Sequence, residues 1–357
     1  MHVPDGFINA PVSMAAGVAA AGAVAISLRG ARRELDERTA PLAGLVAAFI
    51  FSVQMLNFPV AAGTSGHLLG GALAAVLVGP YTGVLCVSVV LLMQGLLFAD
   101  GGLTALGVNV MNMAVVTVIV AYAVFRGLLK VLPDTRRSVT AAAFTGALLS
   151  VPAAAGMFTL LYALGGTTDV PVGKVFTAMV GVHVLIGLGE AAITALTVGA
   201  VLAVRPDLVH GATGLVTPLK LRVDGRLVDA PVAPAAAKAP AAVPLAARST
   251  RKVWATGLVT ALLLAGFVSY YASSSPDGLE KVAADQGIDQ KAEPHAAADS
   301  PLADYGVKDV SDARLSGGLA GVIGVGATIA VGSGVFWAVR RRRGADDRTP
   351  VSTATAL

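Results

Sequence analysis

Apolar residues run through this chain in long blocks that are separated by short polar or charged segments. About nine blocks are long enough, or nearly so, to cross the roughly 30 Å hydrocarbon layer of a membrane as helices. They cover residues 10–28, 42–58, 67–80, 82–98, 103–125, 139–164, 175–204, 253–271 and 316–339. The third block is short, and Gly79-Pro80 followed by Gly83 predicts a helix break between it and the fourth. The pattern predicts an all-α integral membrane protein.

Composition supports a membrane class and excludes several others. Hydrophobic residues make up 55% of the chain and charged residues only 13%, against about 25% charged in soluble domains. The net charge of +4 comes from Lys and Arg beside the apolar blocks, where they orient a protein in the bilayer, so we expect no nucleic-acid partner. Cys86 is the single cysteine, which excludes an internal disulfide and a CxxC metal site.

Clusters of positive charge predict the topology. They follow the first, fifth, seventh and last blocks, at residues 29–38, 126–137, 205 and 340–343. The positive-inside rule places all of them in the cytoplasm, which requires residues 68–98 to cross twice. The N-terminus and the loops around His67 and Asp100 then lie outside, and the C-terminus lies in the cytoplasm.

A Pro/Ala-rich tract at residues 230–240 is typical of a semi-rigid linker and divides the chain. We expect a seven-span domain at 1–210, a cytoplasmic linker at 211–250, a two-span domain at 251–343 with an acidic outer loop, and a cytoplasmic tail at 344–357. Most charges of the outer loop are expected to be solvated, and His295 within it to be incidental.

The start of the chain offers metal chemistry. With His2 in second place, one chain end presents the α-amine of Met1, the backbone amide nitrogen of His2 once deprotonated, and the His2 imidazole. Fused chelate rings hold these nitrogens in one plane, and a fourth nitrogen would complete the square that Ni(II) or Cu(II) prefers. His67 is the predicted fourth ligand. The alternative is a frayed terminus with no role.

Other polar residues lie within the apolar blocks. His183 and Glu190 are two helical turns apart on one face, and ionisable groups at membrane depth mark a functional site or a buried pair. Because they are too far apart to bind one ion, we predict a structural polar pair, with a proton relay as the alternative. Ser65 and Asn109 are predicted to orient the ring of His67, since metal-bound imidazoles donate their second N–H; hydrogen bonding between helices is the other interpretation.

Three segments carry a family resemblance: Met1–Phe7 (MHVPDGF), Gly63–Gly70 (GTSGHLLG) and Val182–Glu190 (VHVLIGLGE). Together they resemble the cobalt/nickel substrate-binding membrane subunit of energy-coupling-factor (ECF) ABC transporters, the CbiM/NikM family, over roughly residues 1 to 210. Residues 276–280 (PDGLE) resemble the signature of a small accessory component, which here looks fused to the larger one, as in NikMN-like proteins.

The resemblance implies an S-component-like helical bundle in a bacterial inner or plasma membrane, working with a separate transmembrane coupling subunit and two cytoplasmic ATPases. It also suggests that the small-residue face of the second block, around Ala43 and Ala47, docks on the coupling subunit.

We therefore expect a non-enzymatic transport subunit that captures Ni2+ on the outer face. Uptake of Co2+ for cobalamin synthesis is the nearest alternative, because selectivity between these ions depends on geometry. A proton-coupled secondary transporter that uses His183 and Glu190, and a scaffold with incidental histidines, are the alternatives from other classes. The sequence contains neither a GxxxxGK[ST] phosphate loop nor an HExxH motif, so ATP hydrolysis is expected from partner subunits.

Overall fold

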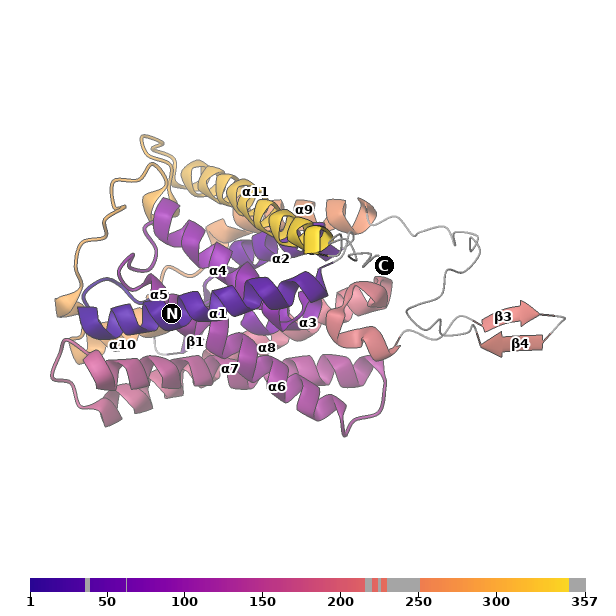
Figure 1. Ribbon diagram of the computed structural model, residues 1–357. Coiled ribbons are helices and arrows are strands. Elements are labelled where there is room, and N and C mark those ends of the chain that lie inside the picture. The colour runs from indigo at the N-terminus through magenta and orange to yellow at the C-terminus, as the bar shows by residue number, and fades with distance from the viewer. Residues whose placement is uncertain (36–38, 62, 216–219, 224–225, 230–250, 347–357) are drawn as a thin grey trace, which may run out of the picture.

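The fold is known from a computed structural model (Figure 1). It describes residues 1–35, 39–61, 63–215, 220–223, 226–229 and 251–346. The Pro/Ala-rich tract predicted as a linker and the tail beyond residue 346 lie outside these residues.

The described part of the chain is almost entirely helical up to residue 215. Its elements are α1 (Ala10–Glu34), α2 (Thr39–Gln54), β1 (Phe58–Ala61), β2 (Thr64–Gly66), α3 (Gly71–Val78), α4 (Pro80–Leu97), α5 (Leu106–Asn109), a π-helix (Val110–Val116), α6 (Thr117–Leu129), α7 (Arg136–Gly165) and α8 (Val172–Val204). Short 3-10 helices follow at Pro206–Leu208 and His210–Leu215. Strands β1 and β2 form an antiparallel pair that ends directly before His67.

The C-terminal part is smaller. An antiparallel pair, β3 (Lys220–Val223) and β4 (Arg226–Asp229), precedes it within the range predicted as a linker. Its helices are α9 (Arg251–Gly266), α10 (Gly278–Gln286) and α11 (Ala313–Asp346), with 3-10 turns at Val268–Tyr271, Asp289–Lys291 and Ala303–Tyr305.

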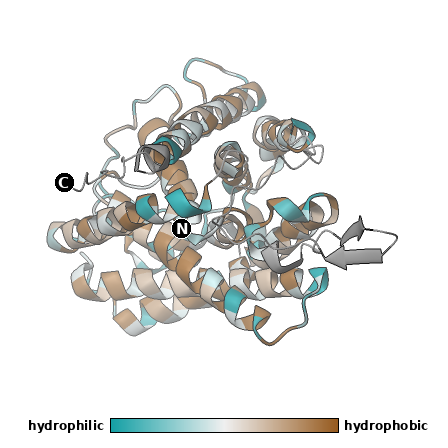
Figure 2. Cartoon of the chain, turned by 45° about the vertical axis from the view of Figure 1, so that its right-hand side comes forward, coloured by the Kyte–Doolittle hydropathy of each residue, from teal (hydrophilic) through white to brown (hydrophobic). Residues whose placement is uncertain are grey.

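The described helices confirm an all-α membrane fold. Six of them are long and apolar enough to cross a membrane: α1, α4, the continuous run Leu106–Leu129, α7, α8 and α11. Large apolar side chains such as Met14, Val18 and Ile26 point outward from α1, as a lipid-facing surface requires. Figure 2 shows hydrophobic residues along the helices and hydrophilic ones mostly near their ends. The exact count of seven plus two spans stays a prediction, because α2 and α9 have only 16 residues each.

The predicted third span differs most from expectation. Only Gly71–Val78 is helical: residues 67–70 have no regular secondary structure, and Gly70 has a φ of 87°, a conformation that favours glycine. At the other end of α3, Gly79 has a φ of 95° and Pro80 begins α4, so the predicted break is confirmed. Glu34, the last residue of α1, accepts hydrogen bonds from the backbone N–H groups of Tyr81 and Thr82 in the first turn of α4. The predicted span is therefore an irregular segment that begins at His67, followed by a short helix that ends near Glu34.

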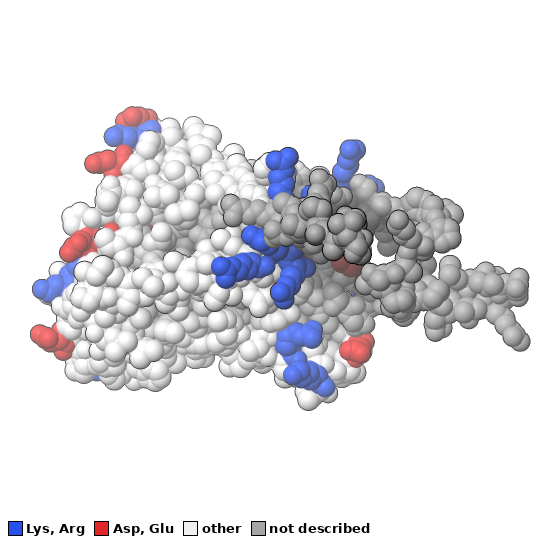
Figure 3. All heavy atoms as spheres, in the orientation of Figure 1, with Lys and Arg blue, Asp and Glu red and all other residues white. Residues whose placement is uncertain are grey.

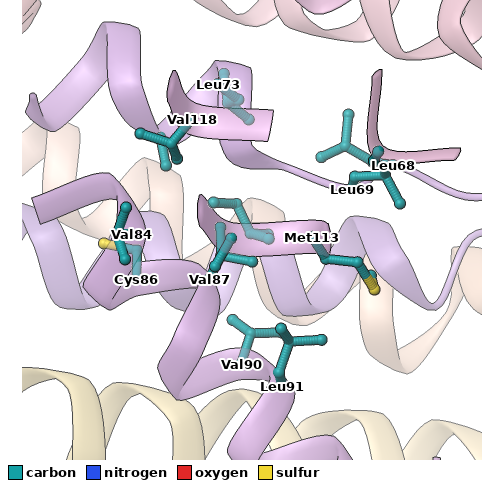
Figure 4. Close-up of a cluster of buried hydrophobic side chains, with 14 of the residues drawn as sticks. Leu68, Leu69, Leu73, Val84, Cys86, Val87, Val90, Leu91, Met113 and Val118 are labelled. Atoms are coloured by element: carbon teal, nitrogen blue, oxygen red, sulfur yellow. The ribbon is translucent and has the colours of Figure 1, made fainter. Parts of the chain in front are cut away.

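The core surrounds this broken segment. Leu68, Leu69 and Leu73 belong to it, and Figure 4 shows them in one cluster with Val87 and Leu91 of α4 and Met113 of the π-helix. All these side chains are buried. Cys86 lies in the same core and is buried, which fits a packing role.

The small-residue face of α2 is covered by α11. A Cβ on Gly44 would lie 2.4 Å from Oγ of Ser333, and one on Gly332 would lie 3.8 Å from Cβ of Ala47. Gly44 and Ala47 are both buried. The expectation that this face docks on a coupling subunit is wrong for this arrangement, because the accessory domain occupies it.

Charge is distributed unevenly between the two ends of the bundle. Figure 3 shows most Lys and Arg side chains at the end where α1 and α6 terminate, and most Asp and Glu side chains at the opposite end. The N-terminus lies toward the acidic end, near α5 and α10 (Figure 1). The orientation in the membrane stays a prediction, which this asymmetry supports.

Candidate metal centre

The start of the chain is buried and fixed, not frayed. Met1 is 2% exposed and Val3 is fully buried. Asn109 holds the backbone of Val3 from both sides: its Oδ1 accepts from the Val3 N–H at 2.7 Å, and its Nδ2 donates to the Val3 carbonyl at 3.1 Å. The Asp5 carboxylate accepts from the N–H and hydroxyl of Thr104, which anchors the segment to the loop before α5.

The amine of Met1 lies between two side chains from distant parts of the chain. It is 2.7 Å from Nε2 of His67 and contacts the carboxylate of Asp277. The Asp277 Oδ2 is also 3.5 Å from His67 Nε2. Nδ1 of His67 lies 3.0 Å from the Leu68 carbonyl, which can only accept, so Nδ1 carries the proton and Nε2 presents its lone pair to the amine.

His2 lies beside this group. Its ring stacks on that of His67 with centroids 5.1 Å apart and 18° between the planes. Gln94 Oε1 lies 3.1 Å from His2 Nε2, and Asp100 Oδ1 lies 3.2 Å from Nδ1, the atom that closes a chelate ring with the chain's own amide. Burial lowers the pKa of His2 to about 4, against the opposing effect of Asp100 at 3.2 Å, so the ring is neutral near pH 7.

The contacts of Ser65 and Asn109 differ from the prediction. The second ring nitrogen of His67 is held by a backbone carbonyl, so neither residue is needed to orient the ring. Asn109 instead fixes the terminus through Val3, and Ser65 donates to the carbonyl of Ser275 at 2.7 Å. Both therefore position other parts of the centre.

His183 and Glu190 are fully buried but do not act as one pair. Glu190 accepts hydrogen bonds from the backbone N–H of Leu69 at 2.6 Å and of Gly70 at 3.1 Å. Nδ1 of His183 donates to the Met179 carbonyl at 2.7 Å, and its Nε2 has no hydrogen-bond partner in the described part of the chain. The helix holds them two turns apart, so each serves a different neighbour. His183 borders a narrow crevice that it shares with Met1, His67 and Asp277.

Asp277 is the residue that the sequence interpretation missed. It belongs to the acidic loop, most of whose charges were expected to be solvated, and its residue exposure is only 8%. The available signal was its place in Pro-Asp-Gly-Leu-Glu, where a resemblance had already been noted. Each residue of this motif has a structural role in bringing the carboxylate to the centre.

The motif is held in place from both domains. The carbonyl of Pro276 accepts from the backbone N–H of Ser65 at 2.9 Å, which attaches the loop to β2. Asp277 and Glu280 form a capping box at the start of α10, with two reciprocal bonds of 2.8 Å. Leu279 is 1% exposed. Gly278 lies close to α8, where a Cβ would be 2.7 Å from Cδ1 of Ile186.

A cavity of about 620 Å³ opens between the two domains above the centre. Its lining includes His2, His67, Asp100, Asp277 and His295. His295 has both ring nitrogens occupied: the Ala297 N–H donates to Nδ1 at 2.9 Å and Nε2 lies 3.1 Å from the Gly101 carbonyl. It therefore offers no lone pair to an ion, as the sequence interpretation expected.

Side chains alone do not make a metal site here. Among the described residues, no three His, Cys, Asp or Glu side chains lie close enough together to hold an ion. The Met1 amine, 2.7 Å from Nε2 of His67, adds a nitrogen that no side chain supplies.

Comparison with known proteins decides the family. Residues 2–208 match the family described as "Cobalt uptake substrate-specific transmembrane region" (CbiM), and residues 251–341 match the PDGLE domain. The chain belongs to the CbiM family. Its C-terminal part is a fused PDGLE-type domain, so the predicted resemblance is confirmed for both parts.

Two transport proteins and one solved structure are similar to this chain. The chain is 42% identical over 212 residues to the "Putative fused nickel transport protein NikMN" of Archaeoglobus fulgidus, covering 59% of this chain and 68% of that protein. It is 39% identical over 209 residues to a "Putative metal transport protein" of Haloquadratum walsbyi, covering 58% of this chain and 93% of that one. A crystal structure of a truncated transition metal transporter superposes with a TM-score of 0.50 at 28% identity, over 57% of this chain and 99% of that chain.

Proposed function

We propose that this CbiM family member captures a divalent transition metal ion, Ni2+ by preference, at the end of the bundle that carries the chain terminus. The observation that carries the proposal is the 2.7 Å separation between the Met1 amine and the lone pair of His67 Nε2. Two nitrogens that bind one ion at about 2 Å and at right angles lie about 2.8 Å apart. The two groups already have the spacing of neighbouring ligands.

His2 would supply the other two nitrogens of the square. Its backbone amide, once deprotonated, and its Nδ1 would close two fused rings with the Met1 amine. A plane of four nitrogens favours Ni(II) or Cu(II) over ions that prefer tetrahedral or octahedral ligands. The name of the Archaeoglobus relative supports nickel, and the name of the matched family keeps Co2+ as the alternative.

The rest of the transport cycle follows from family membership. We propose that the chain is the substrate-binding component of an ECF-type importer, with the centre facing outward and the positively charged end of the bundle in the cytoplasm. A transmembrane coupling subunit and two cytoplasmic ATPases would drive release, since this sequence contains no phosphate-binding loop of its own. The chain itself would then be a transport subunit and not an enzyme.

The test is the metal content and absorption spectrum of the purified chain with Met1 at its terminus, compared with a chain extended by one residue before Met1. We expect about one nickel with the yellow colour of a square-planar complex in the first and none in the second, because an extension converts the amine into an amide. Equal nickel in both proteins would refute the terminal chelate.

A further inference from the structure

Asp277 places a buried negative charge at the candidate metal centre from another domain. Its side chain is 11% exposed and contacts the Met1 amine. A carboxylate removed from water needs a positive partner, and breaking such a pair is strongly destabilising. The Asp277 carboxylate contacts the terminal ammonium ion and lies 3.5 Å from Nε2 of His67, so its charge faces both predicted ligands.

The other carboxylate near the centre has a different environment. Asp100 approaches Nδ1 of His2 at 3.2 Å, but its side chain is 27% exposed toward the cavity. It also accepts a hydrogen bond of 2.6 Å from the hydroxyl of Tyr305. Solvent and Tyr305 share its charge, whereas the charge of Asp277 is directed at the amine.

We propose that Asp277 is the permanent counterion of the metal site, supplied by the accessory domain to the empty and the loaded centre alike. The inference rests on the proposed function and follows from a charge count. In the empty centre the terminal ammonium ion carries one positive charge. In the loaded centre a divalent ion and one deprotonated amide also sum to one positive charge, because loading releases one proton from the ammonium ion and one from the amide. The single negative charge of Asp277 therefore neutralises the positive charge of the centre in both states.

Loss of this charge affects the two states unequally. Without the carboxylate, the metal-free terminus can leave its buried position and be hydrated. The loaded centre cannot do so without losing the ion, so its positive charge would stay buried without a partner. Removing the carboxylate should therefore destabilise the loaded state more, and groups that support metal ligands typically change affinity by about 10- to 100-fold.

The Asp277→Asn variant tests this role in the full-length chain with Met1 intact. Asparagine keeps the Oδ1 acceptor that caps α10, so the motif can fold while the charge is lost. In a titration with Ni2+ against a competing chelator, we expect about 10- to 100-fold weaker binding than in the unchanged chain. Unchanged affinity in a folded Asp277→Asn protein would overturn the proposal.

Two further variants separate charge from loop structure. Asp285→Asn removes a carboxylate from the exposed side of the same helix, where it pairs with Lys281, so it should bind nickel as well as the unchanged chain. Asp277→Glu keeps the charge and should bind more tightly than Asp277→Asn. If Asp285→Asn loses as much affinity as Asp277→Asn, or if Asp277→Glu binds no better than Asp277→Asn, the counterion role is wrong.

The His67→Ala variant distinguishes this inference from the function on which it rests. If His67→Ala loses nickel while Asp277→Asn keeps full affinity, the capture site stands and only the counterion role fails. If His67→Ala binds nickel normally, the capture site itself is wrong, and the counterion role fails with it.

Discussion

Glu190 accepts a 2.6 Å hydrogen bond from the backbone N–H of Leu69, two residues beyond His67. A second bond, to Gly70, occupies its other carboxylate oxygen, and Gln54 donates to the Leu69 carbonyl at 2.9 Å. A non-helical segment inside a membrane bundle must have its backbone groups satisfied by neighbours. Glu190 therefore fixes the segment that presents His67.

Replacing Glu190 by Gln should weaken this segment. The amide keeps one acceptor oxygen but leaves one buried N–H unpaired, which costs about 1–3 kcal/mol. We expect a lower unfolding temperature and weaker nickel binding, measured by a thermal melt and a titration in detergent. A proton relay through His183 and Glu190 predicts instead that nickel binding survives and that proton-driven uptake by the chain alone in liposomes disappears.

Replacing His2 or His67 by Ala should abolish nickel binding at micromolar concentrations, because each change removes a nitrogen from the proposed square. His295→Ala is the matched control, since this histidine lines the same cavity but has both ring nitrogens engaged with the backbone. Equilibrium dialysis with Ni2+ measures all of them. Full binding by His2→Ala, or loss of binding in His295→Ala, would contradict the site.

Acid should release the terminus from its buried position. Burial lowers the pKa of His2 from 6.5 to about 4. Below pH 6.5, a His2 ring exposed to water therefore binds a proton, whereas the buried ring stays neutral. The docked terminus loses up to about 1.4 kcal/mol per pH unit from pH 6.5 down to 4, and His2 adds no pH dependence above 6.5. Asp277 stays ionised throughout, because its pKa is lower still.

Hydrogen exchange of residues 1–10 in the metal-free chain measures this opening. Protection of these amides should decrease as the pH is lowered from 6.5 to about 4, after correction for the intrinsic exchange rate. The His2→Gln variant lacks the titrating ring and should show a smaller slope. An equal slope in both proteins would assign the effect to other groups.

Adding a methyl group at Gly278 should separate the accessory loop from α8. The Cβ of Gly278→Ala would lie 2.7 Å from Cδ1 of Ile186 and 3.1 Å from Cε1 of His183, so either these side chains or the loop that carries Asp277 must move. We expect weaker nickel binding, by about 10-fold or more. Gly181→Ala, on an exposed side of α8 with nothing within 4 Å, is the matched control and should bind nickel normally. Normal binding by Gly278→Ala would show that the close approach is not needed.

The sequence predicted what depends on local pattern. Apolar blocks gave the helical membrane fold, and Gly79-Pro80 marked the break before α4. The short α3 could not be read from the same pattern, because residues 68–78 are apolar throughout and such a run has no period that separates strand from helix. Its non-helical part is stabilised by Glu190 and Gln54, from other helices, which satisfy its backbone groups.

The centre shows the same limit. His2 and His67 were predicted from their chemistry, and the structure brings both to the Met1 amine. Asp277 was missed because 276 positions separate it from Met1, and charge alone does not distinguish a buried carboxylate in an acidic loop from a solvated one. The partners assigned to Ser65 and Asn109 were wrong for a related reason: which backbone an amide or hydroxyl reaches is decided by packing.

The contact between Met1 and Asp277 also sets an order of events during synthesis. His2 and His67 leave the ribosome early, whereas the loop with Asp277 follows only after α8 and α9 have been made. Contacts between residues so distant in sequence form late, since the intervening chain must first be arranged. During most of translation the centre therefore lacks Asp277, and it is completed only when the accessory domain has been synthesised.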